Sequence, residues 1–456
     1  MKRALHVALA LTFATPAFAA RSRRPKAAPT PAPATSTILE EGARTPAPAG
    51  SPASDAGLDP IAIVGGTVWT MDGLPIESGT VLFRDGKIVE VGRDIEIPGK
   101  ARRIDATGKI VTPGLVDAST FLGLSEIDQV TPTADYQVAE TATAIHGAFR
   151  VVDGLNPESV SIPVARMEGV TSAIARPEFG LVSGQGAWIH LDGRRTEDMV
   201  VEAPIALWAA LDEGAKEFAG NSRSAALRRL REAFDDSRLL RTREIQLDEN
   251  RLRALVASRA DLEALWPVID RKIPLVVRAQ KASDIQNALR FARDQKIRVV
   301  IEGGAEAWKV ADELAAAKVP VLIKAMTDLP SSFESLGARF DNAALLEAAG
   351  VTFALVTGDT RNVRTLRQEA GNASAWGLPK DRALYAITRA PAEIFAVAPR
   401  LGTLSKGKIA DVVIWSGDPL ELSTQPLGVW INGKEIPRRS RQTDLLDRYR
   451  TLPPTH

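Results

Sequence analysis

The chain contains no cysteine, and this absence excludes disulfide bonds and thiolate metal sites. Histidine is also scarce, with four residues in 456: His6, His146, His190 and His456. The 57 basic and 56 acidic side chains give a formal net charge of +1, so the charge balance gives no reason to expect nucleic acid as a partner. Beyond the first twenty positions, no apolar run has the roughly 20 residues that a transmembrane helix requires.

The first 57 residues are predicted to lie outside the folded domain. A short positive start and an apolar run are followed by Ala17-Phe18-Ala19, a small-residue cleavage site. Residues 1–19 therefore have the pattern of a secretory signal peptide, with an uncleaved N-terminal anchor as the alternative. Residues 20–57 are rich in Pro and Ala, which predicts a disordered linker. We expect export to a bacterial periplasm or out of the cell.

Two β-rich segments flank the central part of the chain. Residues 58–112 contain short strands, with a hairpin signal at Asp85-Gly86. Residues 397–440 have a similar texture, and no helical pattern separates their strands. We expect both segments to form one small β-sandwich built from the two chain ends, followed by a tail at residues 441–456.

The central residues 113–396 alternate between strands and helices. Strands that recur every 20–30 residues or so, with helices between them, predict parallel βα units. The length suits an α/β fold of the (β/α)8 TIM type, whose active site would lie at the carboxyl ends of the strands. The expected strands are 275–278, 298–301, 319–323 and 351–356, and the expected helices are 283–293, capped by Ser283, 307–317 and 343–349. Residues 221–265 are predicted to form an amphipathic helical insertion, either a surface arm or a contact with another subunit.

The start of this central region carries a family resemblance. Residues 111–124 read Val-Thr-Pro-Gly-Leu-Val-Asp-Ala-Ser-Thr-Phe-Leu-Gly-Leu. This segment resembles the first barrel strand of the amidohydrolase superfamily, PGL(I/V)DxHxH. Residues 386–393 are similar to the family's AxTxNPAxxLG segment, and residues 401–413 to its GSLxxGKxADLVV segment. The resemblance is to the imidazolonepropionase-like branch, and it implies a hydrolase of non-peptide, cyclic amide-type C–N bonds.

The resemblance implies a metal centre whose usual ligands this chain lacks. Members of the superfamily hold Zn or another divalent metal with histidines, and the metal activates a bound water. The two first-strand histidines correspond to Ser119 and Phe121, and the later ones to Arg278 and to Gly303 or, alternatively, Glu302. A hydroxyl is a poor ligand, a phenyl ring is none, and the fixed charge of an arginine repels a cation. We therefore expect no metal and no other cofactor.

One catalytic position of the family has a counterpart in this chain. The eighth-strand Asp corresponds to Asp359, the candidate for proton transfer, and capping of the following helix is the alternative role. A site of oxygen ligands alone is a further alternative, with Glu126, Asp128 and Asp135 among its carboxylates. His146 and His190 are interpreted as structural or solvent-facing residues. The pocket candidates are Asp117, Ser119, Phe121, Arg278, Glu302 and Asp359.

Three functions stay open from the sequence alone. The chain is an active hydrolase with a diverged site, a pseudoenzyme that binds a small molecule or a protein partner, or a structural protein that assembles through residues 221–265. The replaced histidines favour loss of the usual metal-dependent mechanism. Arg278 at the barrel mouth favours an anionic ligand such as a carboxylate, and an internal ion pair is the alternative. A homo-oligomer is compatible with all three functions.

Overall fold

The structure is a computed structural model, and it describes residues 59–127, 130–138, 144–242, 254–326, 330 and 332–450. The predicted signal peptide and linker, Asp128, and part of the predicted helical insertion lie outside these residues. Among the helices described, none combines the length and the apolar character that crossing a membrane would require.

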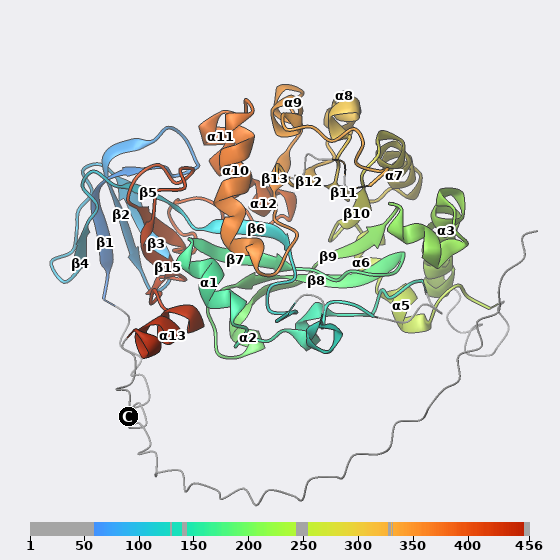
Figure 1. Ribbon diagram of the computed structural model, residues 1–456, viewed down its shortest axis with the longest axis horizontal. Helices are drawn as coiled ribbons and strands as arrows, with labels where there is room; N and C mark the ends of the chain where they lie inside the picture. The colour runs from blue at the N-terminus through green and yellow to red at the C-terminus, as the bar shows by residue number, and fades with distance from the viewer. Residues whose placement is uncertain are drawn as a thin grey trace, which may run out of the picture. The chain divides into compact units, whose positions relative to one another are not determined.

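Segments from both chain ends form one eight-stranded sheet (Figure 1). Its order is β16-β15-β14-β5-β1-β2-β3, and β4 pairs with β1. The two ends meet where β5 pairs antiparallel with β14. The expected β-sandwich is therefore a single continuous sheet. Its strands are β1 (Ile61–Val68), β2 (Ile76–Arg84), β3 (Lys87–Gly92), β4 (Arg102–Asp105), β5 (Ile110–Pro113), β14 (Val412–Trp415), β15 (Pro426–Ile431) and β16 (Lys434–Glu435).

The second sheet also has eight strands and curves into a nearly closed barrel, in the order β13-β12-β11-β10-β9-β8-β7-β6. After the end of β13, the backbone N–H of Gly358 donates to Ser119 O of β6 at 3.0 Å, and the backbone N–H of Phe121, just after β6, donates to Asp359 O at 3.2 Å. The strands are β6 (Leu115–Thr120), β7 (Val170–Ala175), β8 (Val182–His190), β9 (Val200–Ala210), β10 (Leu275–Ala279), β11 (Val299–Gly303), β12 (Val321–Ile323) and β13 (Phe353–Leu355).

The expectation of uniformly parallel strands is wrong for β8, which runs antiparallel to both β7 and β9. Only residues 176–181 join β7 to β8. A parallel crossover needs about a dozen residues, so this short connection forces the chain to reverse. The other neighbouring pairs, from β9 to β13 and from β6 to β7, are parallel.

Helices cover the outside of the barrel (Figure 1). The longest, α3, packs Phe234 edge-on against Phe291 of α7, with ring centroids 5.3 Å apart. The predicted insertion therefore starts with an ordinary barrel helix whose apolar face is buried. The expected cap of α7 is also wrong, since its N-cap is Lys281, without a side-chain cap. The helices are α1 (Ser161–Met167), α2 (Thr196–Met199), α3 (Arg223–Thr242), α5 (Arg259–Glu263), α6 (Trp266–Ile269), α7 (Ala282–Gln295), α8 (Ala311–Ala317), α9 (Asn342–Ala348), α10 (Leu366–Ala375), α11 (Lys380–Ala386), α12 (Arg389–Ile394) and α13 (Arg441–Tyr449), with 3-10 turns at Thr131–Thr133, Val151–Gly154, Gly214–Ala219, Ala307–Val310 and Asn362–Thr365.

The barrel interior is a packed apolar core that is covered at one end. Trp208 from β9 stacks on Phe395, just after α12, with ring centroids 6.4 Å apart. The segment from α12 to Leu401 thereby covers the end where the parallel strands begin, which we call the floor. The opposite end, where these strands finish, is called the mouth. A polar site in this barrel can therefore open only at the mouth or around the floor.

Candidate functional site

Strand periodicity places polar side chains at the mouth. The barrel interior takes one aliphatic residue from each of three neighbouring strands: Val276, Val300 and Leu322. Because side chains alternate along a strand, the residues two positions further on face the same way. These are Arg278, Glu302 and Lys324. Two of the predicted pocket residues therefore project from adjacent strands, and β10 and β11 are paired in register at Arg278 and Glu302.

Ser119, Arg176 and Glu302 form the first half of a charge network at the mouth. The Ser119 hydroxyl donates to Glu302 Oε1. Arg176 Nε donates to Ser119 Oγ at 2.7 Å and lies 3.1 Å from Glu302 Oε1. All three residues are buried. The guanidinium therefore compensates a carboxylate that would be costly to bury alone.

Arg278 forms the second half of this network. Its guanidinium contacts the carboxylates of Glu178 and Asp212. Arg176 Nη1 lies 3.5 Å from Glu178 Oε2, so the two arginines share one carboxylate. Burial alone would raise the pKa of Glu178, but Arg176 and Arg278 outweigh it and hold that pKa below its ordinary value. The geometry thus matches the internal ion pair rather than an open anion receptor at Arg278.

Phe121 covers this network on one side. The Arg176 guanidinium lies 4.3 Å from the centroid of the Phe121 ring, which is cation–π distance. The same ring packs against Tyr136, with centroids 4.2 Å apart. The Phe121 ring therefore lies between Tyr136 and the Arg176 guanidinium and contacts both. We call Ser119, Arg176, Glu178, Asp212, Arg278 and Glu302 the mouth network.

Asp117 has a different role, beneath the mouth. Its side chain is fully buried and accepts hydrogen bonds from Thr357 Oγ1 at 2.5 Å and from the backbone N–H of Ser119 at 3.2 Å. Burial raises the pKa of Asp117 to about 7, although these hydrogen bonds oppose the rise. The contact with Thr357 joins β6 to the residues after β13 and so helps to close the barrel.

Asp359 caps the turn that follows β13. Its Oδ1 accepts backbone N–H bonds from Thr360, Arg361 and Asn362 at 2.6, 2.9 and 3.2 Å, and its Oδ2 accepts from Asn362 Nδ2 at 2.8 Å. Burial would raise the pKa of Asp359, but these donors prevail and lower it. Among the described residues, the donors to this carboxylate all lie within residues 360–362, so the geometry matches the capping role.

Gly303 supplies no side chain to the mouth. Its φ is +99°, and the side-chain amide of Gln280 fills the space that a Cβ would need, at 2.3 Å. Of the two aligned alternatives, Glu302 is the one that reaches the network. Beside the mouth network lies a cavity of about 200 Å³, whose lining includes Asp212, Gln280, Lys324, Glu334 and Asn342.

The other candidate ligands do not converge on one centre. Glu126 is held by Asn156 Nδ2 at 3.1 Å and by the backbone N–H of Val160 at 3.2 Å, and Asp135 is exposed. His190 Nε2 lies 3.1 Å from Asp411 Oδ2, where the barrel meets the other sheet. Within the ranges that the structure describes, no three His, Asp or Glu side chains are grouped as a metal site requires.

Sequence reasoning missed Arg176, Glu178 and Asp212. Arg176 and Glu178 directly follow β7, and Asp212 follows β9. The rule that identified Arg278, polarity at the carboxyl end of a strand, would have found them once those two strands were predicted. They were missed because neither β7 nor β9 is among the strands that the sequence pattern predicts.

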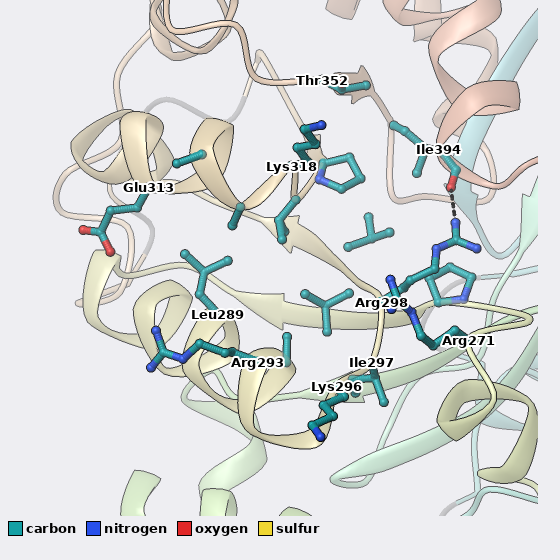
Figure 2. A pocket seen from close by; sticks show the side chains of 18 of the residues that line it. Arg271, Leu289, Arg293, Lys296, Ile297, Arg298, Glu313, Lys318, Thr352 and Ile394 are labelled. Carbon is teal, nitrogen blue, oxygen red and sulfur yellow. Dashed lines mark hydrogen bonds between the residues drawn. The ribbon is translucent and has the colours of Figure 1, made fainter.

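A larger cavity lies away from the mouth. It has a volume of about 1030 Å³ and lies at the floor, between the first residues of β11, the carboxyl ends of α7 and α8, and Ile394 of α12 (Figure 2). A cavity's size alone does not assign chemistry to it. The charged network lies at the mouth, and the larger of the two cavities lies at the floor.

Comparisons with known proteins agree with this fold. Residues 281–436 match the model of the Amidohydrolase family. The chain is similar to the amidohydrolase tasK of Hapsidospora irregularis, 24% identical over 368 residues that make up 74% of this chain, and it spans 37% of that relative's length. It is similar to the crystal structure of an amidohydrolase from Thermotoga maritima MSB8, with 29% identity and a TM-score of 0.76 over 83% of this chain and all of that one. Molinate hydrolase shares the fold at 18% identity and a TM-score of 0.52, over 83% of this chain and 95% of that one.

Proposed function

From the match of residues 281–436 to the amidohydrolase family, we propose that this chain is a diverged amidohydrolase whose metal centre has been replaced by the mouth network. The barrel then serves as a binding protein rather than as a metal-dependent hydrolase. The observation that carries this proposal is the pairing of Arg176 and Arg278 with the carboxylates of Glu178, Asp212 and Glu302.

The residues present do not fit a divalent metal. A metal ion needs carboxylate or imidazole lone pairs, and the carboxylates here are already engaged by guanidinium groups. Binding a cation would displace Arg176 or Arg278 and leave a buried positive charge beside it. Such an uncompensated charge costs several kcal/mol. No catalytic step is therefore assigned to a metal.

A second candidate is hydrolysis of non-peptide C–N bonds without the usual metal. It is favoured by the 29% identity to the Thermotoga maritima amidohydrolase over 83% of this chain and by the cavity of about 200 Å³ beside the network. Lys324 and Asp212 line this cavity, and Asn342 Oδ1 is buried there with no hydrogen-bond partner among the described residues. Small-molecule sites usually exceed about 300 Å³, so this cavity suits only a small substrate without rearrangement.

We further propose that the protein works outside the cytoplasm, in a bacterial periplasm or after secretion. The support is the pattern of the first 19 residues, with its positive start and Ala17-Phe18-Ala19. Mass determination of the protein recovered from a periplasmic extract tests this. Removal of the first 19 residues is expected, and an unprocessed chain in the cytoplasm would contradict it.

The decisive experiment is the metal content of residues 20–456, purified after expression in Zn- and Mn-supplemented medium. Elemental mass spectrometry is expected to find far less than one equivalent, and added Zn²⁺ or Mn²⁺ is expected to leave the melting temperature unchanged. A ligand present at about 100 times its Kd would instead stabilise the fold by about 2.7 kcal/mol. Near-stoichiometric metal would refute the proposal. Turnover of cyclic amides or dipeptides by the metal-free protein would select the second candidate.

A further inference from the structure

The floor cavity is lined by an excess of positive charge. Its lining includes the cations Arg271, Arg293, Lys296, Arg298 and Lys318 and two carboxylates, Glu313 and Glu393. Figure 2 shows Lys318 on one side of the cavity, Arg293 and Lys296 on the opposite side, and Arg271 and Arg298 on a third. Aliphatic side chains such as Leu289 lie between them. The cavity therefore combines an apolar surface with cations on several sides.

The charge at the floor is not compensated as it is at the mouth. Glu393 is engaged by Arg389 at 2.7 Å, and Glu313 accepts from Gln286 at 2.6 Å. Within the described chain, Arg271, Lys296 and Lys318 have no carboxylate at ion-pair distance. Arg298 Nη2 donates weakly to the carbonyl of Ile394 at 3.5 Å (Figure 2). An anion bound at the rim of this cavity would pair with these exposed cations without displacing an existing acidic partner.

Two of these cations occupy backbone positions that favour glycine. Lys296 and Lys318 follow α7 and α8 with φ of +57° and +53°. Each is followed by a residue whose N–H reaches back into the helix: Ile297 to Ala292 O and Val319 to Leu314 O, both at 3.0 Å. This is the Schellman cap, in which glycine is the usual left-handed residue.

The next repeat of the barrel provides an internal comparison. After α9, Gly350 has φ of +76°, and Val351 donates to Leu346 O at 3.0 Å, the same cap. Gly350 does not line the cavity, whereas Lys296 and Lys318 do. Arg271, which precedes β10 and lines the cavity, also has a positive φ, of +63°. Ala396, which does not line the cavity, has φ of +60° in the same kind of cap after α12, so the positive φ of the lysines shows only that glycine can replace them without backbone strain.

We propose that the floor cavity binds a small organic anion that carries more than one negative charge on an apolar body. The apolar lining takes the body, and the cations on different sides take the charges. The volume of about 1030 Å³ is at the upper end of the range for small-molecule sites. Cations at helix carboxyl ends also interact favourably with the helix dipole, and that structural role is the rival explanation of the lysines.

The test uses benzene-1,3,5-tricarboxylate as the probe and its neutral triamide as the control, in calorimetric titrations at low ionic strength. Wild-type protein is expected to bind one tricarboxylate, to lose affinity as salt is added, and to ignore the triamide. The double variant Lys296→Gly, Lys318→Gly is expected to bind roughly tenfold more weakly, since two charges are lost. Its melting temperature is expected to equal or exceed that of the wild type.

Three outcomes would overturn the proposal. The first is no binding by the wild type, and the second is equal binding by the double glycine variant. The third is a lower melting temperature of that variant with binding retained. This third result would assign the lysines to helix capping alone. The double variant Lys296→Arg, Lys318→Arg keeps the charge and the backbone conformation, so it is expected to bind like the wild type. Loss of binding in this variant would also contradict the proposal. None of these results depends on the mouth network or on metal content.

Discussion

The mouth and the floor of this barrel both concentrate charged side chains, but they treat the charge differently. At the mouth, Arg176 and Arg278 are enclosed by Glu178, Asp212 and Glu302. At the floor, Arg271, Lys296 and Lys318 line a cavity of about 1030 Å³ and have no acidic partner within the described residues. At the mouth, the cations are paired with carboxylates of the protein. At the floor, these cations have no described carboxylate partner and are exposed to solvent.

This difference shows two ways in which one barrel can accommodate charged side chains. A buried charge must be compensated, and at the mouth the carboxylates of Glu178, Asp212 and Glu302 are paired with arginines. An exposed cation is stabilised by water and needs no partner, so it can remain available to a ligand. The predictions below test the two ends against each other.

The largest effect is expected from Arg278→Ala at the mouth. This change leaves Asp212 and part of Glu178 without their cation in a largely buried site. The free energy of unfolding should fall by about 3 kcal/mol, measured by urea denaturation. Arg228→Ala is the control, because Arg228 pairs with Glu232 on an exposed helix face and should cost about 0.5 kcal/mol or less. Equal losses in the two variants would show that the mouth network is not a buried, coupled unit.

Asp117 gives the next effect, as a dependence of stability on pH. Its folded pKa of about 7 lies above its ordinary value of 3.8, so between these values the folded chain keeps a proton that the unfolded chain releases. This group therefore makes stability fall as pH rises from about 4 to about 7, by up to about 1.4 kcal/mol per pH unit. Asp117→Asn removes this contribution. The unfolding free energy of the wild type minus that of the variant should therefore decrease as pH rises through this window.

Asp359 is the matched control for this pH dependence, because its pKa is lowered. Its contribution is present above pH 3.8 and is lost as the pH falls further. Asp359→Asn should therefore leave the slope between pH 4 and 7 unchanged. If thermal melts gave the two variants the same dependence of stability on pH between 4 and 7, the protonation of Asp117 in the folded chain would be disproved.

A smaller effect is expected from Asp359→Ala. Loss of the three backbone hydrogen bonds at the turn should cost about 1 kcal/mol of unfolding free energy, which chemical denaturation would resolve. Asp359→Asn keeps an acceptor oxygen and should recover most of this loss. If hydrolysis of a C–N substrate were found, abolished turnover in a folded Asp359→Asn variant would instead assign Asp359 to proton transfer.

The smallest effects are expected at the floor. Lys296→Gly relieves a left-handed lysine and should stabilise the fold by about 0.5–1 kcal/mol, whereas Gly350→Lys introduces the same strain and should destabilise it by a similar amount. A Cβ at Gly350 meets no atom within 4 Å, so the comparison isolates the backbone conformation. Thermal melts of both variants measure it. Destabilisation by Lys296→Gly would mean that the lysine is present for the helix and not for a ligand.

Local sequence patterns predicted much of the second half of the barrel. The expected strand 275–278 ends one residue before β10 does, and the expected strand 298–301 begins one residue before β11 and ends two residues before it. The segment from residue 124 to residue 275 was harder to predict. Its strands β7, β8 and β9 form an antiparallel meander, and no helix pattern between β7 and β8 marks where these strands begin and end. In the other domain, short strands were foreseeable, but their pairing into one sheet depends on contacts between the two chain ends.

The sequence by itself determined that cysteine chemistry is absent and that Ser119, Phe121 and Arg278 stand where the resemblance expects histidines. These properties depend only on residue type and spacing. The tertiary structure decided which charges meet, since Ser119 and Glu302 are separated by 183 positions in the chain. It also decided that Lys296 and Lys318 line one cavity, because neighbouring parallel strands bring successive helix ends together at the floor. Burial and charge compensation depend on distances in space, and a linear sequence contains no such distances.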